Sequence, residues 1–590
     1  INNSLWTEPY NHDKVKILVR KEKESSSELS FFTKNKDLLH TVLILEVIQM
    51  SDRMNEIKKR RTFAIISHPD AGKTTLTEKF LLYGGVINTA GSVKGKATAK
   101  HAVSDWMEIE KERGISVTSS VLQFNYGGYC INILDTPGHQ DFSEDTYRTL
   151  MAADSAVMVI DGSKGVEAQT IKLFKVCVMR HIPIFTFINK MDREARDPFE
   201  LMDEIETVLG IRTCPVNWPI GCGHEFKGVY DRNKKTITTF QAAMNGQKAV
   251  DATEVLLGDP QVDWLIGEDY HHQLMEDIEL LDGASDELDM DRVGKGDLSP
   301  VFFGSALTNF GVETFLQHFL QMTTTPLPRL ADKGVIDPFE EKFSAFVFKI
   351  QANMNKAHRD RIAFMRIVSG KFEAGMEVNH VQGGRKLRLS QPQQMMAQDR
   401  KIVEEAYAGD IIGVFDPGIF SIGDTLCLSN EKFEYEGIPT FAPEHFARVR
   451  QMDTMKRKQF IKGVNQIAQE GAIQIFQEFN TGMEEIIVGV VGELQFEVLT
   501  YRLENEYNVE VKLEKLPYEY IRWVENKDEI DVAKIQGTSD MKRIKDLKDN
   551  PLLLFVNSWS VGMVLERNPG LKLSEFGKKL INRSTRRQQI

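Results

Sequence analysis

The chain has 590 residues, enough for several domains, and its 42% hydrophobic content is ordinary for a folded globular protein. Its 73 lysine and arginine residues against 85 aspartate and glutamate residues give a formal charge of −12. This balance argues against a protein that coats nucleic acid indiscriminately, because such binding requires a basic excess. Any contact with RNA must therefore be local. The five scattered cysteines suit a reducing compartment.

The segment before residue 55 carries no recognisable motif. Its apolar stretch from Leu38 to Met50 is interrupted by Glu46 and falls short of the roughly 18 residues of a membrane span. A small-residue cleavage site is missing, and the charged run Lys21 to Glu28 precedes the stretch, so it is no secretory signal either. Because Met50 or Met54 would be a natural start, we expect residues 1–54 to be an extraneous or disordered extension. We expect no membrane association.

A phosphate-binding loop is predicted after the apolar run Thr62 to Ile66 and before residues that are typical of a helix. Its eight residues are Ser67, His68, Pro69, Asp70, Ala71, Gly72, Lys73 and Thr74. In such a loop Gly72 lets the backbone approach a phosphate, Lys73 reaches the β and γ phosphates, and Thr74 places a hydroxyl on Mg²⁺. Ser67 replaces the usual opening glycine, which is tolerable if this residue keeps a negative φ. Taken alone, the segment could also be an ordinary strand-to-helix turn.

A second motif follows the predicted strand Ile131 to Leu134 and consists of Asp135, Thr136, Pro137, Gly138 and His139. It places a carboxylate at the carboxyl end of a strand, beside the phosphate loop. Asp135 can therefore hold Mg²⁺ through water, and the Gly138 backbone N–H can meet a γ-phosphate.

Two further motifs concern the base. The predicted strand Pro183 to Ile188 leads into Asn189, Lys190, Met191 and Asp192, and the predicted strand Pro300 to Phe303 leads into Gly304, Ser305 and Ala306. A carboxylate such as Asp192 accepts hydrogen bonds from both the ring N–H and the exocyclic amine of guanine, a pair that adenine lacks. Each motif alone could be a solvated turn. Four in this order, each at a strand's carboxyl end, predict a guanine-nucleotide site.

The polar segment Glu112 to Thr118 is predicted to be a first switch, and the segment after Gly138 a second, whose order depends on a γ-phosphate. With Asp105 to Glu108 and Asp135 to Phe142, this region resembles the translational GTPases, and within them the bacterial peptide chain release factor 3 family. The resemblance covers about Arg60 to Glu525. Further similar segments are Trp218 to Gly223, Phe226 to Tyr230, Phe346 to Met354, His358 to Arg361, Val491 to Glu497 and Glu506 to Glu510.

The resemblance implies a ribosome-stimulated GTPase that uses GTP/GDP and Mg²⁺ and promotes dissociation of class-one release factors from the ribosome. Ser116 stands where related factors carry the Mg²⁺-binding threonine, so the implied metal set is Thr74, Ser116 and Asp135, with Thr118 a weaker substitute. His139 would orient the attacking water once ribosomal RNA pushes it inward; the alternative is a surface histidine that caps the next helix. We expect a cytoplasmic monomer.

The expected architecture is multidomain. An α/β P-loop GTPase domain with a doubly wound sheet is predicted at 55–325, with an inserted subdomain at about 193–300. The linker Pro326 to Pro328 should lead into an antiparallel β-barrel domain at 326–440, where β-rich runs alternate with glycine turns. An α+β C-terminal domain is predicted at 441–590, because helical and strand patterns alternate there.

Several alternatives stay open. The chain could be another translational GTPase, although an elongation factor G-like translocase carries further domains, or it could be a ribosome-rescue or resistance factor, or a GTP-dependent scaffold on the ribosome. Cys214, Cys222 and His224 lack a fourth ligand at a finger-like spacing and are not expected to bind metal. The basic groups Arg448 to Arg450 with Lys456 to Lys458, and Arg385 to Arg388, could face RNA or only solvent.

Overall fold

The computed structural model describes residues 50–87, 109–110, 116–240, 252–353, 361–389, 392–396, 399–428, 432–438, 440–479 and 486–575. The chain divides into two units, residues 1–55 and 56–590, and all contacts discussed below lie within the second. Most of the predicted extension and residues 111–115 of the predicted first switch lie outside the described residues. Within the described ranges, no helix is both long enough and apolar enough to cross a membrane.

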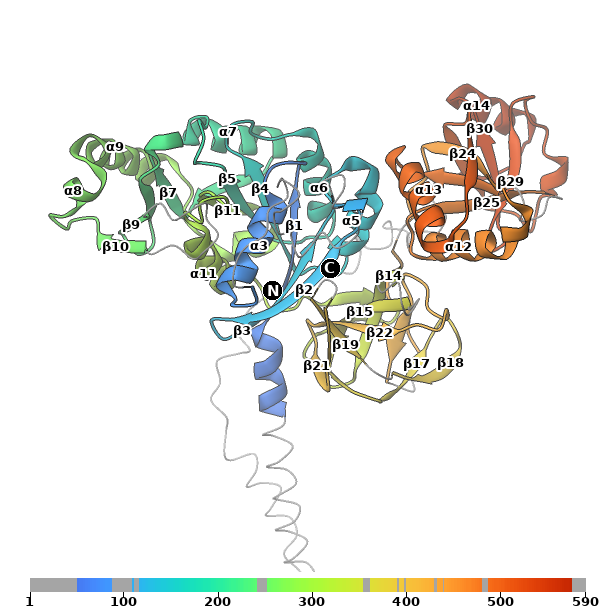
Figure 1. The fold of residues 1–590 in the computed structure, drawn as a ribbon, viewed down its shortest axis with the longest axis horizontal. Helices are drawn as coiled ribbons and strands as arrows, with labels where there is room; N and C mark the ends of the chain where they lie inside the picture. Colours follow the sequence, from blue (N-terminus) through green and yellow to red (C-terminus); the bar gives the residue numbers. More distant parts are fainter. Residues whose placement is uncertain are drawn as a thin grey trace, which may run out of the picture. The chain divides into compact units, whose positions relative to one another are not determined.

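A doubly wound α/β sheet forms the amino-terminal part of the second unit (Figure 1). Its strands, in spatial order, are β2 (Ser120–Tyr126), β3 (Tyr129–Asp135), β1 (Arg60–Ser67), β4 (Ser155–Asp161), β5 (Ile184–Asn189), β11 (Leu298–Phe303) and β6 (Arg212–Pro215). All neighbours are parallel except β2 and β3. The carboxyl ends of the parallel strands therefore meet at one edge, where a doubly wound sheet binds ligands.

Helices cover both faces of this sheet. They are α3 (Lys73–Tyr83), α5 (Ser143–Leu150), α6 (Ala168–Met179), α7 (Pro198–Leu209) and α11 (Val312–Met322). Alternate residues of β1 enter opposite cores, because successive side chains of a strand point to opposite faces. Phe63 packs edge-on against Phe80 and Phe319, from α3 and α11, whereas Ile66 belongs to the core that contains Leu173 of α6. The predicted α/β class is confirmed.

Between β6 and β11 the chain forms a small antiparallel sheet with helices. These elements are β7 (Asn217–Ile220), β8 (Gly228–Asp231), β9 (Thr236–Phe240), β10 (Ala252–Leu256), α8 (Val262–Ile266), α9 (Glu268–Ala284) and α10 (Met290–Lys295), with the short 3₁₀ helix η2 (Gly223–Glu225). Trp218 holds this part to the main sheet: its ring packs against Phe199 and Phe303, and its indole N–H donates to Asp277 at 2.8 Å. Helix α7 and strand β6 fall in the range predicted as an insertion but belong to the main fold.

Antiparallel strands wrapped into a barrel follow the hairpin β12 (Arg329–Ala331) and β13 (Gly334–Ile336) (Figure 1). They are β14 (Ser344–Ala352), β15 (Arg361–Ser369), β16 (Lys371–Glu373), β17 (Glu377–His380), β18 (Arg385–Arg388), β19 (Gln393–Met396), β20 (Asp399–Ile402), β21 (Glu405–Tyr407), β22 (Ile411–Phe415) and β23 (Thr425–Cys427). Buried Phe343, Met365, Ile412 and Leu426 share their apolar core. The predicted antiparallel barrel is confirmed.

The last part is α+β, as predicted. Its sheet runs, in spatial order, β27 (Val511–Leu516), β24 (His445–Gln451), β26 (Ile486–Val490), β25 (Gln474–Glu478), β29 (Lys542–Asp546), β30 (Pro551–Phe555), β28 (Tyr520–Val524) and β31 (Leu573–Ser574). Its helices are α12 (Arg457–Gln469), α13 (Leu494–Tyr507) and α14 (Ser558–Arg567), with the 3₁₀ turns η4 (Thr454–Lys456) and η5 (Val532–Lys534). Phe460 of α12 and Leu503 of α13 pack on Val488 of β26.

Buried polar contacts join the barrel to the α/β sheet. Arg366 of β15 forms an ion pair with Asp154, and both side chains are almost fully buried. The Gly409 carbonyl accepts from the Thr62 hydroxyl at 2.6 Å. Gly409 has φ +104°, and a Cβ there would lie 2.8 Å from the Arg60 side chain, so only glycine fits this loop.

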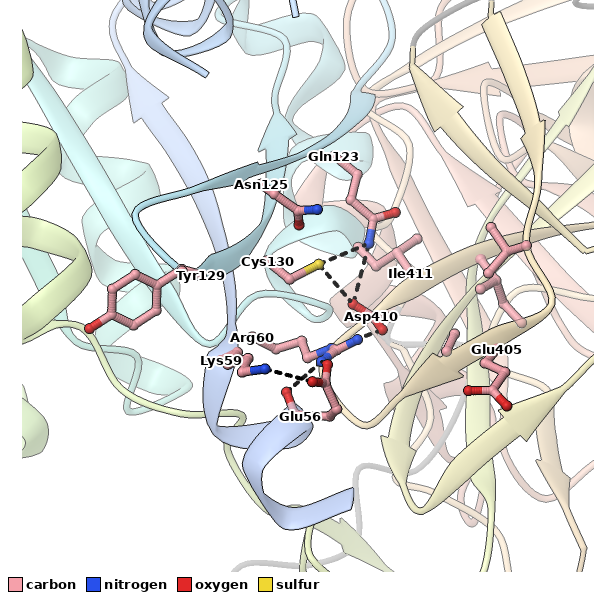
Figure 2. Close-up of a pocket in the computed structure, with 14 residues that line it drawn as sticks. Glu56, Lys59, Arg60, Gln123, Asn125, Tyr129, Cys130, Glu405, Asp410 and Ile411 are labelled. Atoms are coloured by element: carbon pink, nitrogen blue, oxygen red, sulfur yellow. Dashed lines mark hydrogen bonds and ion pairs between the residues drawn. The ribbon is translucent and has the colours of Figure 1, made fainter. Parts of the chain in front are cut away.

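A cavity of about 420 Å³ lies beside this contact (Figure 2). Asp410 occupies its centre and accepts from Gln123 at 3.3 Å, from Arg60 at 3.1 Å and from the Cys130 thiol at 3.7 Å. Burial and the neighbouring Asp410 carboxylate raise the pKa of Cys130 to about 12, so the thiol stays protonated and acts as a donor. These four polar groups therefore satisfy one another.

Candidate functional site

The phosphate loop lies between β1 and α3, as predicted. Ser67 ends β1 with a negative φ, so serine is accommodated there without strain. Two residues turn the loop through the left-handed region, Asp70 with φ 66° and Gly72 with φ 100°. Gly72 is the N-cap of α3, so the first N–H groups of this helix face the loop, an arrangement that suits phosphate.

Asn189 ties the phosphate loop to the two base loops. Its side-chain amide donates to the Ala71 carbonyl at 2.8 Å, and its side-chain oxygen accepts from the Ala306 N–H at 2.8 Å. A Cβ on Gly72 would lie 2.2 Å from the Asn189 amide nitrogen. The glycine is thus required by a protein side chain as well as by the positive φ, a reason that the sequence motif does not reveal.

Lys73 and Asp135 lie in direct contact at the carboxyl edge of β1 and β3. The Lys73 ammonium is 2.7 Å from the Asp135 carboxylate, and both side chains are nearly fully buried. Thr136 donates to the Ile65 carbonyl at 2.7 Å, and a Cβ on Gly138 would lie 3.5 Å from the Cα of Pro69. The structure therefore brings the first two predicted motifs together.

The donor set predicted for Mg²⁺ consists of hard oxygen ligands, which suit this ion. Asp135 ends β3, and Thr74 lies in the first turn of α3. Thr118 is held by Glu110, which accepts from its N–H at 3.1 Å and lies 3.4 Å from its hydroxyl. Glu110 also accepts from the Val117 N–H at 2.9 Å, so it orders the end of the predicted switch. No sequence motif marks Glu110 for this task.

The base-side loops also meet. The Asp192 carboxylate accepts from the Ser305 hydroxyl at 2.6 Å, which fixes the carboxylate predicted to select guanine. Lys190 adopts φ 70° and donates to Asp161 at 2.7 Å. Burial disfavours the ionised Asp161, but the hydrogen bonds from Lys190 and Ser163 outweigh it and hold the pKa of Asp161 below its ordinary value. Asp161 ends β4. Its position at a strand's carboxyl end is the one sequence feature that could have identified it as a residue of the site.

His139 follows the second motif at the start of the 3₁₀ helix η1 (Gln140–Phe142). Its Nδ1 lies 3.3 Å from the Asp141 backbone nitrogen and 3.2 Å from the Asp141 carboxylate, and its side chain is 37% exposed. The ring therefore lies where it can cap the next helix, which is the alternative to a catalytic role. The catalytic role stays a prediction.

Carboxylates lie beside the two basic groups that could face RNA, and they offset part of the positive charge of each group. Arg448 forms ion pairs with Glu478 at 3.3 Å and with Glu514 at 3.8 Å. Lys386 pairs with Glu377 at 3.3 Å. These contacts reduce the positive charge that either group presents to an RNA backbone.

Comparisons with known proteins match each part of the chain. The family models that match are the elongation factor Tu GTP binding domain over residues 58–325, elongation factor G domain 2 over 342–429, and the class II release factor RF3 C-terminal domain over 435–565. A solved structure from Thermus thermophilus shares the fold, with a TM-score of 0.63 at 22% identity over 79% of this chain and 69% of that one.

Among curated proteins, the chain is similar to peptide chain release factor 3 of several bacteria. It is 62% identical to that of Symbiobacterium thermophilum over 88% of this chain and 98% of the relative. It is 54% identical to that of Gloeobacter violaceus, again over 88% and 98%. Identity at this level over nearly the whole relative confirms the resemblance found in the sequence. The chain belongs to the peptide chain release factor 3 family.

Proposed function

We propose that the chain is a GTP-hydrolysing factor of translation termination that acts on the ribosome and promotes dissociation and recycling of class-one release factors. The observation that carries this proposal is the meeting of the phosphate loop and both base loops on Asn189, in a chain whose carboxyl-terminal part matches the release factor domain. Membership in the family makes it a translational GTPase of termination.

Phosphoryl transfer depends chiefly on positioning and on neutralising charge. The α3 N-terminus and the Lys73 ammonium would bind the phosphates, while Asp192, fixed by Ser305, would read guanine. Thr74, Ser116 and Asp135 would hold Mg²⁺, which supplies charge neutralisation at the β and γ phosphates. The oxygen chemistry of these three residues supports that assignment.

His139 would orient the attacking water. Its partly exposed ring and its contact with Asp141 support a resting position from which ribosome docking moves it. Because positioning supplies much of the rate, hydrolysis would be slow without the ribosome and fast on it. We further propose a cytoplasmic location and a monomeric state, the latter testable by light scattering on the purified chain.

The test is GTP hydrolysis by the purified chain with and without ribosomes, with ATP as the competing substrate. Strong ribosome stimulation that is lost in His139→Ala, with ATP inert, supports the proposal, and release-factor recycling is assayed next. His272→Ala, at an exposed helical histidine that pairs with Glu276, serves as the matched control and should behave as wild type. Equal rates with and without ribosomes would refute the gated mechanism.

A further inference from the structure

Asp141 lies between the candidate catalytic histidine and the carboxyl-terminal part of the chain. One oxygen of its carboxylate is 3.2 Å from His139 Nδ1. The other accepts from the Leu494 backbone N–H at 2.8 Å, at the first residue of α13. Its side chain is only 11% exposed. A single buried carboxylate thus joins His139 to a helix more than three hundred residues away in the sequence.

The residues around Asp141 leave room for its contact with α13. A Cβ on Gly492 would lie 2.1 Å from Asp141 Cγ, so glycine at that position admits the carboxylate to the helix terminus. Phe142 and Val498 bury their side chains beside the contact, in one apolar cluster with Val117 from the end of the predicted first switch. The low exposure of the Asp141 side chain strengthens its hydrogen bonds, because they lie in surroundings of low dielectric.

The His139 ring faces two conflicting partners. The Asp141 backbone N–H requires Nδ1 to be an acceptor, whereas the Asp141 carboxylate requires Nδ1 to carry a proton. One neutral ring cannot satisfy both, and the bond made at one nitrogen decides which nitrogen is protonated. With the proton on Nδ1, Nε2 is left as a hydrogen-bond acceptor, the form that can receive a hydrogen bond from water.

We propose that Asp141 is a positioning residue for GTP hydrolysis. Its carboxylate, held in place by the Leu494 N–H, selects the Nδ1-protonated form of His139 and so leaves Nε2 free to accept from the attacking water. Seating of α13 against Asp141 thereby sets the rate at the nucleotide site. This inference rests on the proposed catalytic role of His139.

The first test is a double-mutant cycle on ribosome-stimulated hydrolysis by the full chain. Asp141→Asn keeps one oxygen for the Leu494 N–H but turns an amide donor toward Nδ1, which favours the opposite tautomer. We expect kcat to fall by about 10- to 100-fold with the KM for ribosomes changed less than about twofold, because a residue that only orients a catalytic group typically contributes this much. Combined with His139→Ala, it should cause no further loss.

Two variants approach the same contact from α13. Gly492→Ala places a methyl group against Asp141 and should lower kcat in the same direction. Glu493→Gln is the matched control, because this exposed neighbour pairs with Lys515 rather than with Asp141, and it should leave the rate unchanged. Thermal midpoints and binding of a fluorescent GDP analogue, measured for each variant, identify any variant that fails to fold.

The second test reads the tautomer directly. Imidazole ¹⁵N signals of the histidine-labelled chain, with His139 assigned by its loss in His139→Ala, should show the proton on Nδ1 in wild type and on Nε2 in Asp141→Asn. An unchanged tautomer overturns the inference, as do independent, multiplying effects of Asp141→Asn and His139→Ala. Full activity in Asp141→Asn, with activity lost in His139→Ala, also overturns it but leaves the proposed function standing. Full activity in His139→Ala refutes the proposed catalytic role itself.

Discussion

Replacing Asn189 by alanine should separate the phosphate loop from the base loops. The change removes two buried hydrogen bonds and leaves the Ala71 carbonyl and the Ala306 N–H without their partner. Each such orphaned group costs about 1–3 kcal/mol, or about 2–6 kcal/mol for the two. If the lower figure, about 2 kcal/mol, destabilises the nucleotide-bound state relative to the free state, the affinity for GDP drops about 30-fold, since about 1.4 kcal/mol is a factor of ten.

The measurement is titration with a fluorescent GDP analogue, with a thermal melt to separate loss of affinity from loss of fold. Asn125→Ala, at an exposed residue of β2, is the control and should bind as wild type. Gly72→Ala should also weaken binding, because its methyl group meets the Asn189 amide at 2.2 Å. Adding Asn189→Ala to it relieves that clash, so the two losses should be less than additive. An affinity of Asn189→Ala within threefold of wild type would refute this reasoning.

Three further predictions rest on single contacts. Asp192→Asn loses the charged acceptor for guanine and should weaken GTP binding by about 10- to 100-fold. In competition assays, xanthine nucleotides should bind better to this variant than to wild type. An unchanged base preference would contradict the role of Asp192. Arg366→Met leaves Asp154 buried without its ion-pair partner. It should lower the free energy of unfolding, measured in urea, by about 3–5 kcal/mol. A loss below about 1 kcal/mol would contradict a stabilising role for the ion pair. Hydrogen bonds from Lys190 and Ser163 outweigh burial and lower the pKa of Asp161. The stabilisation that Asp161 contributes is therefore present above about pH 4 and disappears as the pH falls through the lowered folded-state pKa. Asp161→Asn should therefore flatten the fall in thermal midpoint on acidification below about pH 4, and a fall as steep as that of wild type would exclude this contribution.

The fold and the nucleotide loops could be predicted from the sequence because the signals for them are local in the chain. Apolar runs such as Thr62 to Ile66 predict buried strands, and each loop motif follows its strand directly, so chain order alone places the motifs at one edge of a parallel sheet. The bounds of β1, Arg60–Ser67, extend the predicted strand by only a few residues. The exact domain boundaries, the roles of the site residues and the nature of the amino-terminal extension stay predictions.

The contacts between segments that lie far apart in the chain could not be predicted from the sequence. Nothing near Gly409 in the sequence indicates that its carbonyl meets Thr62, and nothing near Asp141 indicates that it caps α13. Asp161 lacks a motif of its own, because its task is to hold Lys190 through a bond that only the folded sheet brings about. Such pairings depend on the packing of whole elements, which local pattern does not encode.

The buried ion pair of Arg366 with Asp154 limits how freely the parts of this protein can be exchanged in evolution or engineering. A chimera that takes its barrel from one relative and its α/β sheet from another keeps both halves of the pair only if each parent carries the matching charge. With one half missing, the remaining charge stays buried and unpaired between the barrel and the α/β sheet, so such a chimera should lose about 3–5 kcal/mol of folding free energy. Recombination should therefore succeed when the cut leaves the barrel and the α/β sheet together.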